Sequence, residues 1–551
     1  MNDKHTAIFM QSCFPLERLR PAQATALDFI GDCFEKDYRD VVISAPTGTG
    51  KSGIGAAVGL WSSTQHVTGY QAGSYYLVTQ KLLQDQLEND MANWTPTWRN
   101  QSGSLKSSAD YPCSTFASCM AGALASKNKG VGGATCQQRA DKSCPYTRAR
   151  IRFEHAALAV TNYPYLFTEH TYLDSLDARN VLIGDECHTL ERQILGFVDI
   201  AVTPETVLNW APTCLPVPCM ESLFEFKNWL LTEYLVCCKS RLEALAANLA
   251  ASRFANLRIQ TEYNQLGNHI SRIEGACTDI ENEPDAWVYW QEVSNKSQQW
   301  CSYAKPLSAA PFRKRLLDDM GSRRVYMSAY PGPKSVFCRS LGLNEKDVAW
   351  LELDSDFPVS NRPIHLTTIG SMGRKNAAET LPRLLAMCET ILGAYPLEKG
   401  IIHCHSYALG QEIYNYLKSK SCGNRVLFAS RAEDRKTNFT LHRTTELPTV
   451  ILSPSVSEGY SFDDDLARFQ IIAKVPYPYL GDRQVAAKME QDRDWYTMQT
   501  IMGIIQACGR IVRSATDHGD TYILDHDFVR LYEENPTFFP AWFSAALHFY
   551  R

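Results

Sequence analysis

The sequence predicts an α/β fold with more than one domain, and three observations carry this prediction. The chain has 551 residues, which is too long for a single hydrophobic core. The apolar run 41–44 is typical of a buried parallel strand, and a glycine-bearing turn follows it. A second apolar run, 181–184, ends on two acidic residues.

The composition is that of a globular protein, with 45% hydrophobic residues, 21% charged residues and a net charge of −5. No apolar run reaches the roughly 20 residues of a membrane span, and the polar start 1–5 does not resemble a secretory signal, so we expect no membrane association. Because non-specific DNA-coating proteins are usually basic, any nucleic-acid contact should be confined to a local groove. Lone cysteines such as Cys404 and Cys508, among 18 in total, suit a reducing compartment.

The stretch 45–52 has the parts of a phosphate-binding loop. Small residues let backbone N–H groups approach phosphate oxygens, and the following helix points its positive end at the anion. Lys51 would reach the β- and γ-phosphates of ATP, and Ser52 would bind Mg²⁺. The strict pattern has Gly at the first position, so a chance Gly-Lys-Ser turn remains an alternative. The predicted loop residues are Ala45, Pro46, Thr47, Gly48, Thr49, Gly50, Lys51 and Ser52.

Two flanking segments carry polar groups near this loop. The helical pattern 24–34 follows Gln23, whose amide could read an adenine edge, although a solvated helix start fits equally well. The strand 74–79 runs into a polar segment with Thr79 and Lys81 at its start, where open α/β sheets bind ligands. A capped helix with a solvated lysine is the alternative.

Four cysteines lie in or beside a Ser-, Gly- and Lys-rich stretch, with the spacing C-x5-C-x16-C-x7-C. The pattern lacks the short Cys pairs of zinc ribbons. Four thiolates spread over a loop could hold a [4Fe–4S] cluster, and four unrelated free thiols would give the same spacing. The residues are Cys113, Cys119, Cys136 and Cys144.

Further along, the strand 156–161 ends on the polar residues Asn162 and Tyr163, and the strand 181–184 ends on Asp185 and Glu186. An apolar strand that delivers Asp-Glu after a phosphate-binding loop is what an ATPase needs. Asp185 would complete the Mg²⁺ shell and Glu186 would orient or deprotonate the attacking water. His188 would hydrogen-bond to motifs in a second domain.

These motifs resemble those of the iron–sulfur branch of superfamily 2 helicases, the XPD/DinG-type enzymes, over nearly the whole chain. The loop 45–52 resembles motif I, 79–86 resembles motif Ia, and 185–188 resembles the DEAH-type box, here DECH. The resemblance implies two RecA-like α/β motor domains, the first with an iron–sulfur insertion and a helical arch insertion. It also implies that the four cysteines hold a structural [4Fe–4S] cluster.

The second motor domain should complete the nucleotide site. The segment 506–513 resembles motif VI, and we predict that Arg510 and Arg513 share one helix face and stabilise the γ-phosphate. Gln506, one turn earlier, would position water or phosphate. The strand 325–330 resembles motif III but has Tyr330 where Thr is usual, and 457–462 resembles motif V but has Ser461 where Asp is common.

The resemblance sets the predicted boundaries. Motor domain 1 comprises 1–110, 150–204 and 308–358; the cluster domain 111–149; the arch 205–307; and motor domain 2 359–551. Long helical stretches at 220–245 and 249–274 fit the arch. We assign DNA contacts to Thr79, Lys81, Asn162 and Tyr163.

The resemblance implies a monomeric ATP-dependent DNA helicase that moves 5′ to 3′ on single-stranded DNA and unwinds fork or overhang duplexes. We expect it in the cytoplasm of a bacterial or virus-infected cell, or in a eukaryotic nucleus. Two other classes stay open: an ATP-driven translocase that remodels protein–DNA complexes without unwinding, and a non-catalytic DNA-binding module with a decayed motor. No residue excludes RNA as the substrate.

Overall fold

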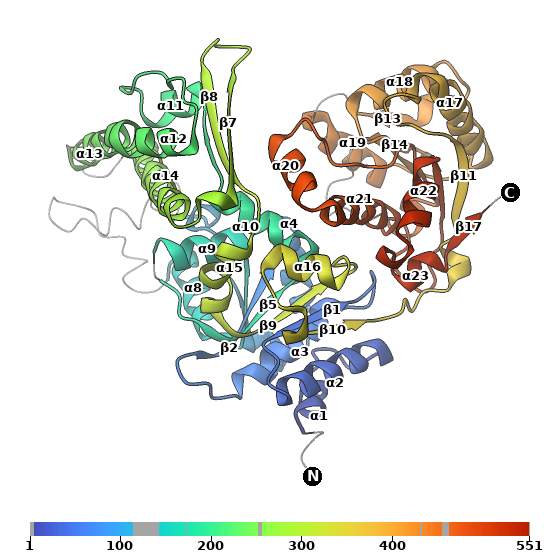
Figure 1. The fold of residues 1–551 in the computed structure, drawn as a ribbon. Helices are drawn as coiled ribbons and strands as arrows, with labels where there is room; N and C mark the ends of the chain where they lie inside the picture. Colours follow the sequence, from blue (N-terminus) through green and yellow to red (C-terminus); the bar gives the residue numbers. More distant parts are fainter. Residues whose placement is uncertain are drawn as a thin grey trace.

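Two parallel seven-stranded sheets form the cores of two lobes, and a mostly helical insertion stands on the first lobe (Figure 1). The computed structural model describes residues 5–113, 119, 143–173, 175–251, 256–429, 432–454 and 462–549. The predicted α/β class with two RecA-like lobes is confirmed. No helix of these residues is long and apolar enough to cross a membrane.

The sheet of the first lobe has the order β10-β1-β9-β5-β2-β4-β3. Its central strands are buried on both faces, because helices cover the sheet from either side (Figure 1). The strands are β1 (Asp40–Ser44), β2 (Gln71–Val78), β3 (Ser102–Ser104), β4 (Leu158–Asn162), β5 (Arg179–Gly184), β9 (Gly321–Ser328) and β10 (Val348–Glu352). The helices are α1 (His5–Ser12), α2 (Pro21–Glu35), α3 (Lys51–Ser63), α4 (Lys81–Ala92), α5 (Pro96–Gln101), α8 (Pro145–His155), α9 (Tyr163–Thr171), α10 (Leu190–Val198), α15 (Ala310–Leu316) and α16 (Lys334–Leu341).

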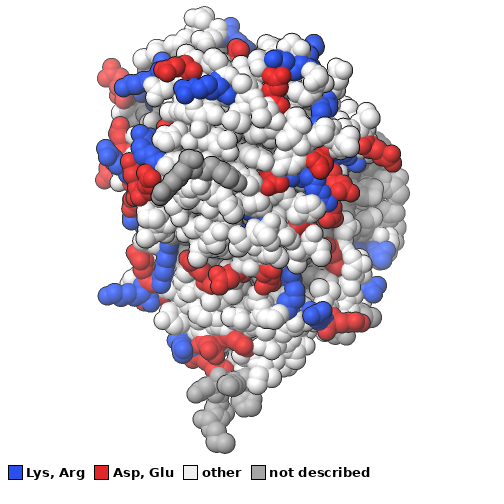
Figure 2. Space-filling view, turned by 90° about the vertical axis from the view of Figure 1, so that its right-hand side faces the viewer, with Lys and Arg blue, Asp and Glu red and all other residues white. Residues whose placement is uncertain are grey.

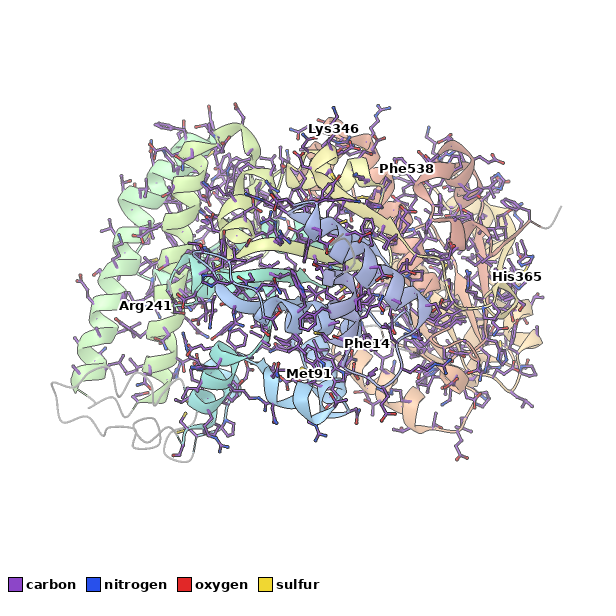
Figure 3. The ribbon with its side chains drawn as sticks, turned by 90° about the horizontal axis from the view of Figure 1, so that it is seen from below. Phe14, Met91, Arg241, Lys346, His365 and Phe538 are labelled. Atoms are coloured by element: carbon purple, nitrogen blue, oxygen red, sulfur yellow. The ribbon has the colours of Figure 1, made fainter. Side chains whose placement is uncertain are left out.

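The insertion leaves the first lobe after α10 and returns before α15. Its two long helices overlap the predicted helical stretches but end later in the sequence, and Arg241 on α13 lies at the opposite end of the molecule from His365 in the second lobe (Figure 3). An antiparallel sheet of order β6-β8-β7 was not predicted from the sequence. The elements are β6 (Ile200–Val202), α11 (Pro204–Trp210), α12 (Leu223–Trp229), a π-helical turn (Leu230–Tyr234), α13 (Leu235–Ala251), α14 (Leu257–Asn282), β7 (Trp287–Val293) and β8 (Trp300–Pro306).

The second lobe has the sheet order β13-β14-β12-β15-β16-β11-β17. Its strands are β11 (Ile364–Gly370), β12 (Gly400–His403), β13 (Val426–Phe428), β14 (Val450–Ser453), β15 (Phe469–Ile472), β16 (Asp520–Asp525) and β17 (Leu547–Phe549). Its helices are α17 (Ala377–Ala394), α18 (Tyr407–Lys418), α19 (Ala432–Thr444), α20 (Arg483–Gln491), α21 (Arg493–Cys508), α22 (Asp527–Glu534) and α23 (Ala541–Ser544).

A buried ion pair joins the amino end of β1 to the middle of β9. Arg324 donates from Nε to Asp40 Oδ1 at 2.6 Å and from Nη2 to Oδ2 at 3.0 Å, and the two residues are register partners. Arg324 is 4% exposed and Asp40 6%. This pair therefore fixes the relative position of the two strands whose carboxyl ends enter the site described below.

Replacing Arg324 with Met should lower the free energy of unfolding by about 3 to 5 kcal/mol, because Asp40 would stay buried without its bidentate partner. Urea unfolding followed by tryptophan fluorescence measures the loss. Arg383→Met is the matched control, since its contact with Glu379 is exposed and 4.0 Å long, and it should cost less than about 1 kcal/mol. Equal losses in both variants would contradict this account.

Candidate nucleotide and nucleic-acid site

The predicted phosphate-binding loop closes between the end of β1 and the start of α3. Gly48 and Gly50 have φ values of 84° and 81°, in the left-handed region that glycine tolerates best. Ala45 is buried and donates its N–H to the Ser328 carbonyl at 2.8 Å, without a positive φ. Glycine is therefore not required at the first position of this loop. Lys51 begins α3, and its Nζ lies 3.4 Å from the Ala45 carbonyl oxygen.

Gln23, on α2, hydrogen-bonds to this loop. Its Oε1 accepts the Arg20 N–H at 2.9 Å, and its Nε2 donates to the Thr49 carbonyl at 2.9 Å. A Cβ at Gly50 would lie 2.5 Å from that Nε2. Both ends of the amide are thus engaged with the protein, and the adenine contact of Gln23 stays a prediction.

The two predicted Mg²⁺ ligands meet at one buried phenol. Tyr76 donates its hydroxyl to Asp185 Oδ2 at 3.0 Å, and the Ser52 hydroxyl also hydrogen-bonds to Tyr76. Burial and the charge of Glu186 raise the pKa of Asp185, which Lys51 opposes. A cation at this point would favour the ionised carboxylate, so the donor set fits Mg²⁺.

Glu186 follows in a left-handed conformation, with φ of 50°. Burial opposes its ionisation, but the hydrogen bond from His188 and the charges of Lys51, His188 and Arg510 outweigh burial and lower its pKa. His188 Nδ1 lies 3.2 Å from Glu186 Oε2 and 2.8 Å from Ser328 Oγ. His188 thus hydrogen-bonds to motif III of its own lobe, and the hydrogen bond of His188 to the second domain stays a prediction.

The segment 506–513 differs from the prediction in one respect. Gln506 lies in the last turn of α21, but the helix ends at Cys508, so Arg510 and Arg513 do not share a helix face. The prediction of one continuous helix was wrong because Asp517, buried after the turn, accepts the Arg513 N–H at 3.0 Å and holds the chain in a loop.

The two lobes meet over the phosphate-binding loop. A Cβ at Gly48 would lie 3.0 Å from the Arg513 carbonyl oxygen, and a Cβ at Gly509 would lie 3.5 Å from Thr47 Oγ1. The charges of Arg510 and Arg513 both act on Glu186 across this interface. Burial and the charge of Arg510 lower the pKa of Arg513 to about 10.

A cavity of about 320 Å³ opens beside this contact, lined by His188 of the first lobe and by Gln506 and Arg510 of the second. Gln506 Nε2 and Arg513 Nε are buried without a hydrogen-bond partner. Unsatisfied buried donors at a positively charged interface indicate a site shaped for an anion.

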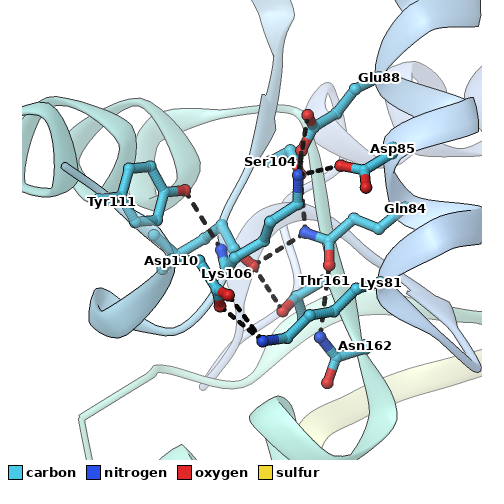
Figure 4. A network of polar contacts seen from close by, with 11 residues as sticks. Lys81, Gln84, Asp85, Glu88, Ser104, Lys106, Asp110, Tyr111, Thr161 and Asn162 are labelled. Atoms are coloured by element: carbon cyan, nitrogen blue, oxygen red, sulfur yellow. Dashed lines mark hydrogen bonds and ion pairs between the residues drawn. The ribbon is translucent and has the colours of Figure 1, made fainter.

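Two of the predicted DNA contacts, Lys81 and Asn162, lie in a polar network at the carboxyl ends of β2 and β4 (Figure 4). Lys81 pairs with Asp110 at 2.8 Å, and Asn162 donates to Gln84 Oε1 at 3.3 Å and caps α9 (Figure 4). Thr79 is buried, and its hydroxyl has no hydrogen-bond partner. For Thr79, Lys81 and Asn162 the DNA contact stays a prediction.

Tyr163 requires a correction. Its side chain is fully buried and its hydroxyl donates to the Asp185 carbonyl at 3.1 Å. The residue therefore supports the acidic motif from behind, and in this conformation it presents no surface to a nucleic acid.

Three of the four predicted cluster cysteines are among the described residues, and Cys136 lies outside them. Cys119 Sγ lies 2.8 Å from Cys144 Sγ, and both are buried. Cys144 is the N-cap of α8; burial opposes its ionisation, but hydrogen bonds from Cys119 and Thr147 outweigh burial and lower its pKa. Two close thiols, one favouring the thiolate, fit a metal–sulfur ligand set. The described residues alone do not bring three metal-binding side chains together.

Several residues that shape this site were not predicted from the sequence. Tyr76 and Ser328 are buried inside strands, where nothing in the sequence distinguishes them from core residues. Phe357, in the link between the lobes, packs against Gly48. The motif V residues 457–461 lie outside the described residues.

Comparison with known proteins agrees with this geometry. The family described as "Helicase C-terminal domain" matches residues 389–546, and the family "Type III restriction enzyme, res subunit" matches residues 16–210. A regulator of telomere elongation helicase 1 homolog from Caenorhabditis elegans is 24% identical over 280 residues, which cover 42% of this chain and 27% of that protein. Its Caenorhabditis briggsae counterpart is 32% identical over 103 residues, 16% of this chain and 10% of that protein.

Two solved structures show the same fold. A structure of an XPD helicase superposes with a TM-score of 0.63 at 15% identity, covering 97% of this chain and 100% of the other. The structure of S. tokodaii Xpd4 gives a TM-score of 0.54 at 11% identity, covering 94% and 98%. Each lobe thus carries a family match, and the chain has the two-lobed fold of these XPD structures and is similar to helicases of the XPD and RTEL1 type.

Proposed function

We propose that this protein is an ATP-dependent DNA helicase that moves 5′ to 3′ along single-stranded DNA and separates the duplex ahead of it. The observation that carries this proposal is the position of Glu186. It lies in the first lobe, and the charges of Lys51, Arg510 and Arg513 from both lobes act on it. A nucleotide held there would contact both lobes, so its hydrolysis would change how they fit together.

ATP binds with its phosphates against the loop 45–52. The backbone N–H groups and Lys51 hold the phosphate oxygens. Ser52 and Asp185 are the residues that would hold Mg²⁺, which neutralises charge on the β- and γ-phosphates. Glu186 is ionised, because its pKa is lowered, and orients the attacking water and accepts its proton. His188 keeps that carboxylate in place.

The second lobe supplies the remaining charge. Arg510 and Arg513 face the γ-phosphate when the lobes are closed, and their guanidinium groups stabilise the charge of the transition state. Loss of the γ-phosphate removes the anion that both lobes share, so the lobes separate. Repetition of this cycle moves the two lobes along the bound strand.

The DNA strand would lie across the carboxyl ends of β2 and β4, against Thr79, Lys81 and Asn162. The face that carries the second lobe mixes acidic and basic side chains without a continuous basic area (Figure 2). Combined with the net charge of −5, this favours a local strand-binding groove over a broad DNA-coating surface. We propose a monomer as the working unit.

A [4Fe–4S] cluster held by Cys113, Cys119, Cys136 and Cys144 would cross-link the segment between β3 and α8 to the first lobe. The proximity of Cys119 and Cys144 supports this assignment. When bound, the cluster would have a structural role rather than a redox one.

Two alternatives remain distinct. A decayed motor is disfavoured because the chain keeps the charged residues of the nucleotide site: Lys51, Asp185, Glu186, Arg510 and Arg513. A translocase that displaces proteins without unwinding would have the same nucleotide site. Two assays run in parallel distinguish a helicase from such a translocase: strand displacement, and displacement of streptavidin from biotinylated DNA. A helicase would separate the strands, whereas a translocase would displace only the streptavidin.

Lys51→Ala and Glu186→Gln should each lower the DNA-stimulated ATPase kcat by about 100-fold or more, because each removes a group that acts on the transferred phosphate or its water. A coupled ATPase assay with and without single-stranded DNA measures this. Lys296→Ala, a lysine between β7 and β8, is the control and should retain wild-type turnover. Near-wild-type turnover in either site variant would show that the site is assigned wrongly.

Unwinding should require a 5′ single-stranded overhang. Strand displacement from otherwise identical duplexes with 5′, 3′ or no overhang measures the polarity, and the rate should fall as salt rises, because the grip depends on phosphate contacts. Preference for the 3′ overhang would reverse the proposed polarity and leave the ATPase assignment intact.

Cys144→Ser should reduce bound iron and the visible absorption of anaerobically purified protein to near background, and abolish unwinding. Iron analysis and absorption spectra measure this independently of activity. Cys338→Ser, a buried cysteine of α16 remote from the cluster segment, should keep its iron. A Cys144→Ser protein with full iron content would exclude this cysteine as a ligand.

A further inference from the structure

A buried ionic contact joins the lobes directly behind the acidic motif. Glu191 lies in the first turn of α10, three residues after His188, and is 9% exposed. Its Oε1 accepts the Lys488 ammonium of α20 at 2.5 Å, and its Oε2 accepts Trp495 Nε1 of α21 at 2.7 Å. Lys488 and Trp495 belong to the second lobe and are 6% and 8% exposed.

The Lys488 ammonium has further partners besides Glu191. The Lys488 ammonium also donates to the Leu307 carbonyl at 2.8 Å and lies 4.5 Å from the centroid of the Trp495 ring. A buried lysine and a buried glutamate are costly unless they are paired and hydrogen-bonded, and this geometry meets both conditions. Breaking this contact would leave a buried charge unpaired, which is energetically costly. The contact therefore favours one defined position of the second lobe against the first.

Other contacts at the same end of α21 reinforce it. Asp492, the N-cap of α21, accepts two hydrogen bonds from Arg339 of α16, at 2.6 and 2.8 Å. Gln484 of α20 donates to the Pro306 carbonyl at 2.6 Å. The amino end of α21 is thus attached to the first lobe at several points.

The opposite end of α21 reaches the nucleotide site. The helix has 16 residues, so it is about 24 Å long, and it ends in Gln506 and Cys508, two residues before Arg510. A tilt of about 5° at the attached end would move the far end by about 2 Å over this length. Misplacement of catalytic groups by about 1 Å can cost about 100-fold in rate.

We infer that Glu191, Lys488 and Trp495 form a positioning contact that sets the angle of α21 and thereby places Arg510 and Arg513 against the γ-phosphate. The inference rests on the proposed ATPase function and adds positioning residues to it. The contact starts in the same short segment as Glu186 and His188. The same segment of the first lobe therefore positions both the general base Glu186 and, through α21, the two arginines.

Trp495→Phe tests this most directly, because it keeps the ring against Lys488 and removes only the Nε1–H donor. With saturating single-stranded DNA, the ATPase kcat should fall about tenfold or more, with KM for ATP within about threefold. Glu191→Gln should have a similar effect, since it removes the charge that pairs with Lys488. Lys420→Met is the matched control: it breaks an ion pair with Glu389 inside the second lobe and should leave kcat and KM unchanged.

A binding measurement separates positioning from a merely structural role. A fluorescent ADP should bind the variants and wild type within about twofold, because its site is on the first lobe. Aluminium fluoride, which mimics the transferred phosphate, should tighten ADP binding in wild type and much less in the Trp495→Phe and Glu191→Gln variants. A structural defect alone would instead lower the melting temperature and weaken both forms of binding equally, and would overturn the inference.

The remaining outcomes are also decisive. Variants with wild-type kcat and the wild-type response to aluminium fluoride would show that the contact does not position the arginines. Wild-type protein that lacks both ATPase activity and this response would refute the proposed function itself. The two failures are distinguishable, because the first appears only in the variants and the second in the parent protein.

Discussion

The site depends on positive charge buried where the two lobes meet. Arg510 and Arg513 lie near each other at the interface, and the pKa of Arg513 is lowered by burial and by the charge of its neighbour. Two adjacent guanidinium groups in a low dielectric repel each other unless an anion lies between or beside them. Glu186 supplies one negative charge, and the buried donors Gln506 Nε2 and Arg513 Nε have no hydrogen-bond partner. A triphosphate would satisfy both the charge and the hydrogen-bond requirement.

The first sheet creates this arrangement through the ends of neighbouring parallel strands. β1, β9 and β5 are adjacent, and the register pairs Ser44 with Ser328 and Gly184 with Tyr326. The phosphate-binding loop, motif III and the acidic motif therefore leave the sheet at one edge, although they lie far apart in the sequence. The hydrogen bonds between Ala45 and Ser328 and between Ser328 and His188 follow from that adjacency. The buried pair of Arg324 and Asp40 joins the amino end of β1 to the middle of β9.

The strands and the residues at their ends could be predicted from the sequence, because a buried strand is a run of local apolar residues and a phosphate-binding loop is a local motif. Features that depend on tertiary contacts could not. The motif VI helix stops at Cys508 because Asp517 and the packing of Ile511 and Val512 favour a loop there. Tyr163 follows a strand like a ligand-facing residue, but its ring fills the core under Asp185. The nucleic-acid contacts were the least predictable part, since polar residues at strand ends also cap helices.

One departure from the family motifs, Tyr330, is explained by a contact between the lobes. Tyr330, where the motif has Thr, is buried among second-lobe residues and donates its hydroxyl to the Phe538 carbonyl. The aromatic side chain thus gives motif III a direct contact with the second lobe that a threonine could not reach.

Phe357 extends this coupling to the phosphate-binding loop. It lies in the link between the lobes and packs in a cluster with Ile511 and Val512 of the second lobe. Its Cζ would lie 2.1 Å from a Cβ at Gly48, so glycine is needed at this position for the contact as well as for the positive φ. In the proposed cycle, a separation of the lobes would therefore change the contact between Phe357 and the loop. The ring would link the opening of the cleft to the conformation of the loop that holds the phosphates.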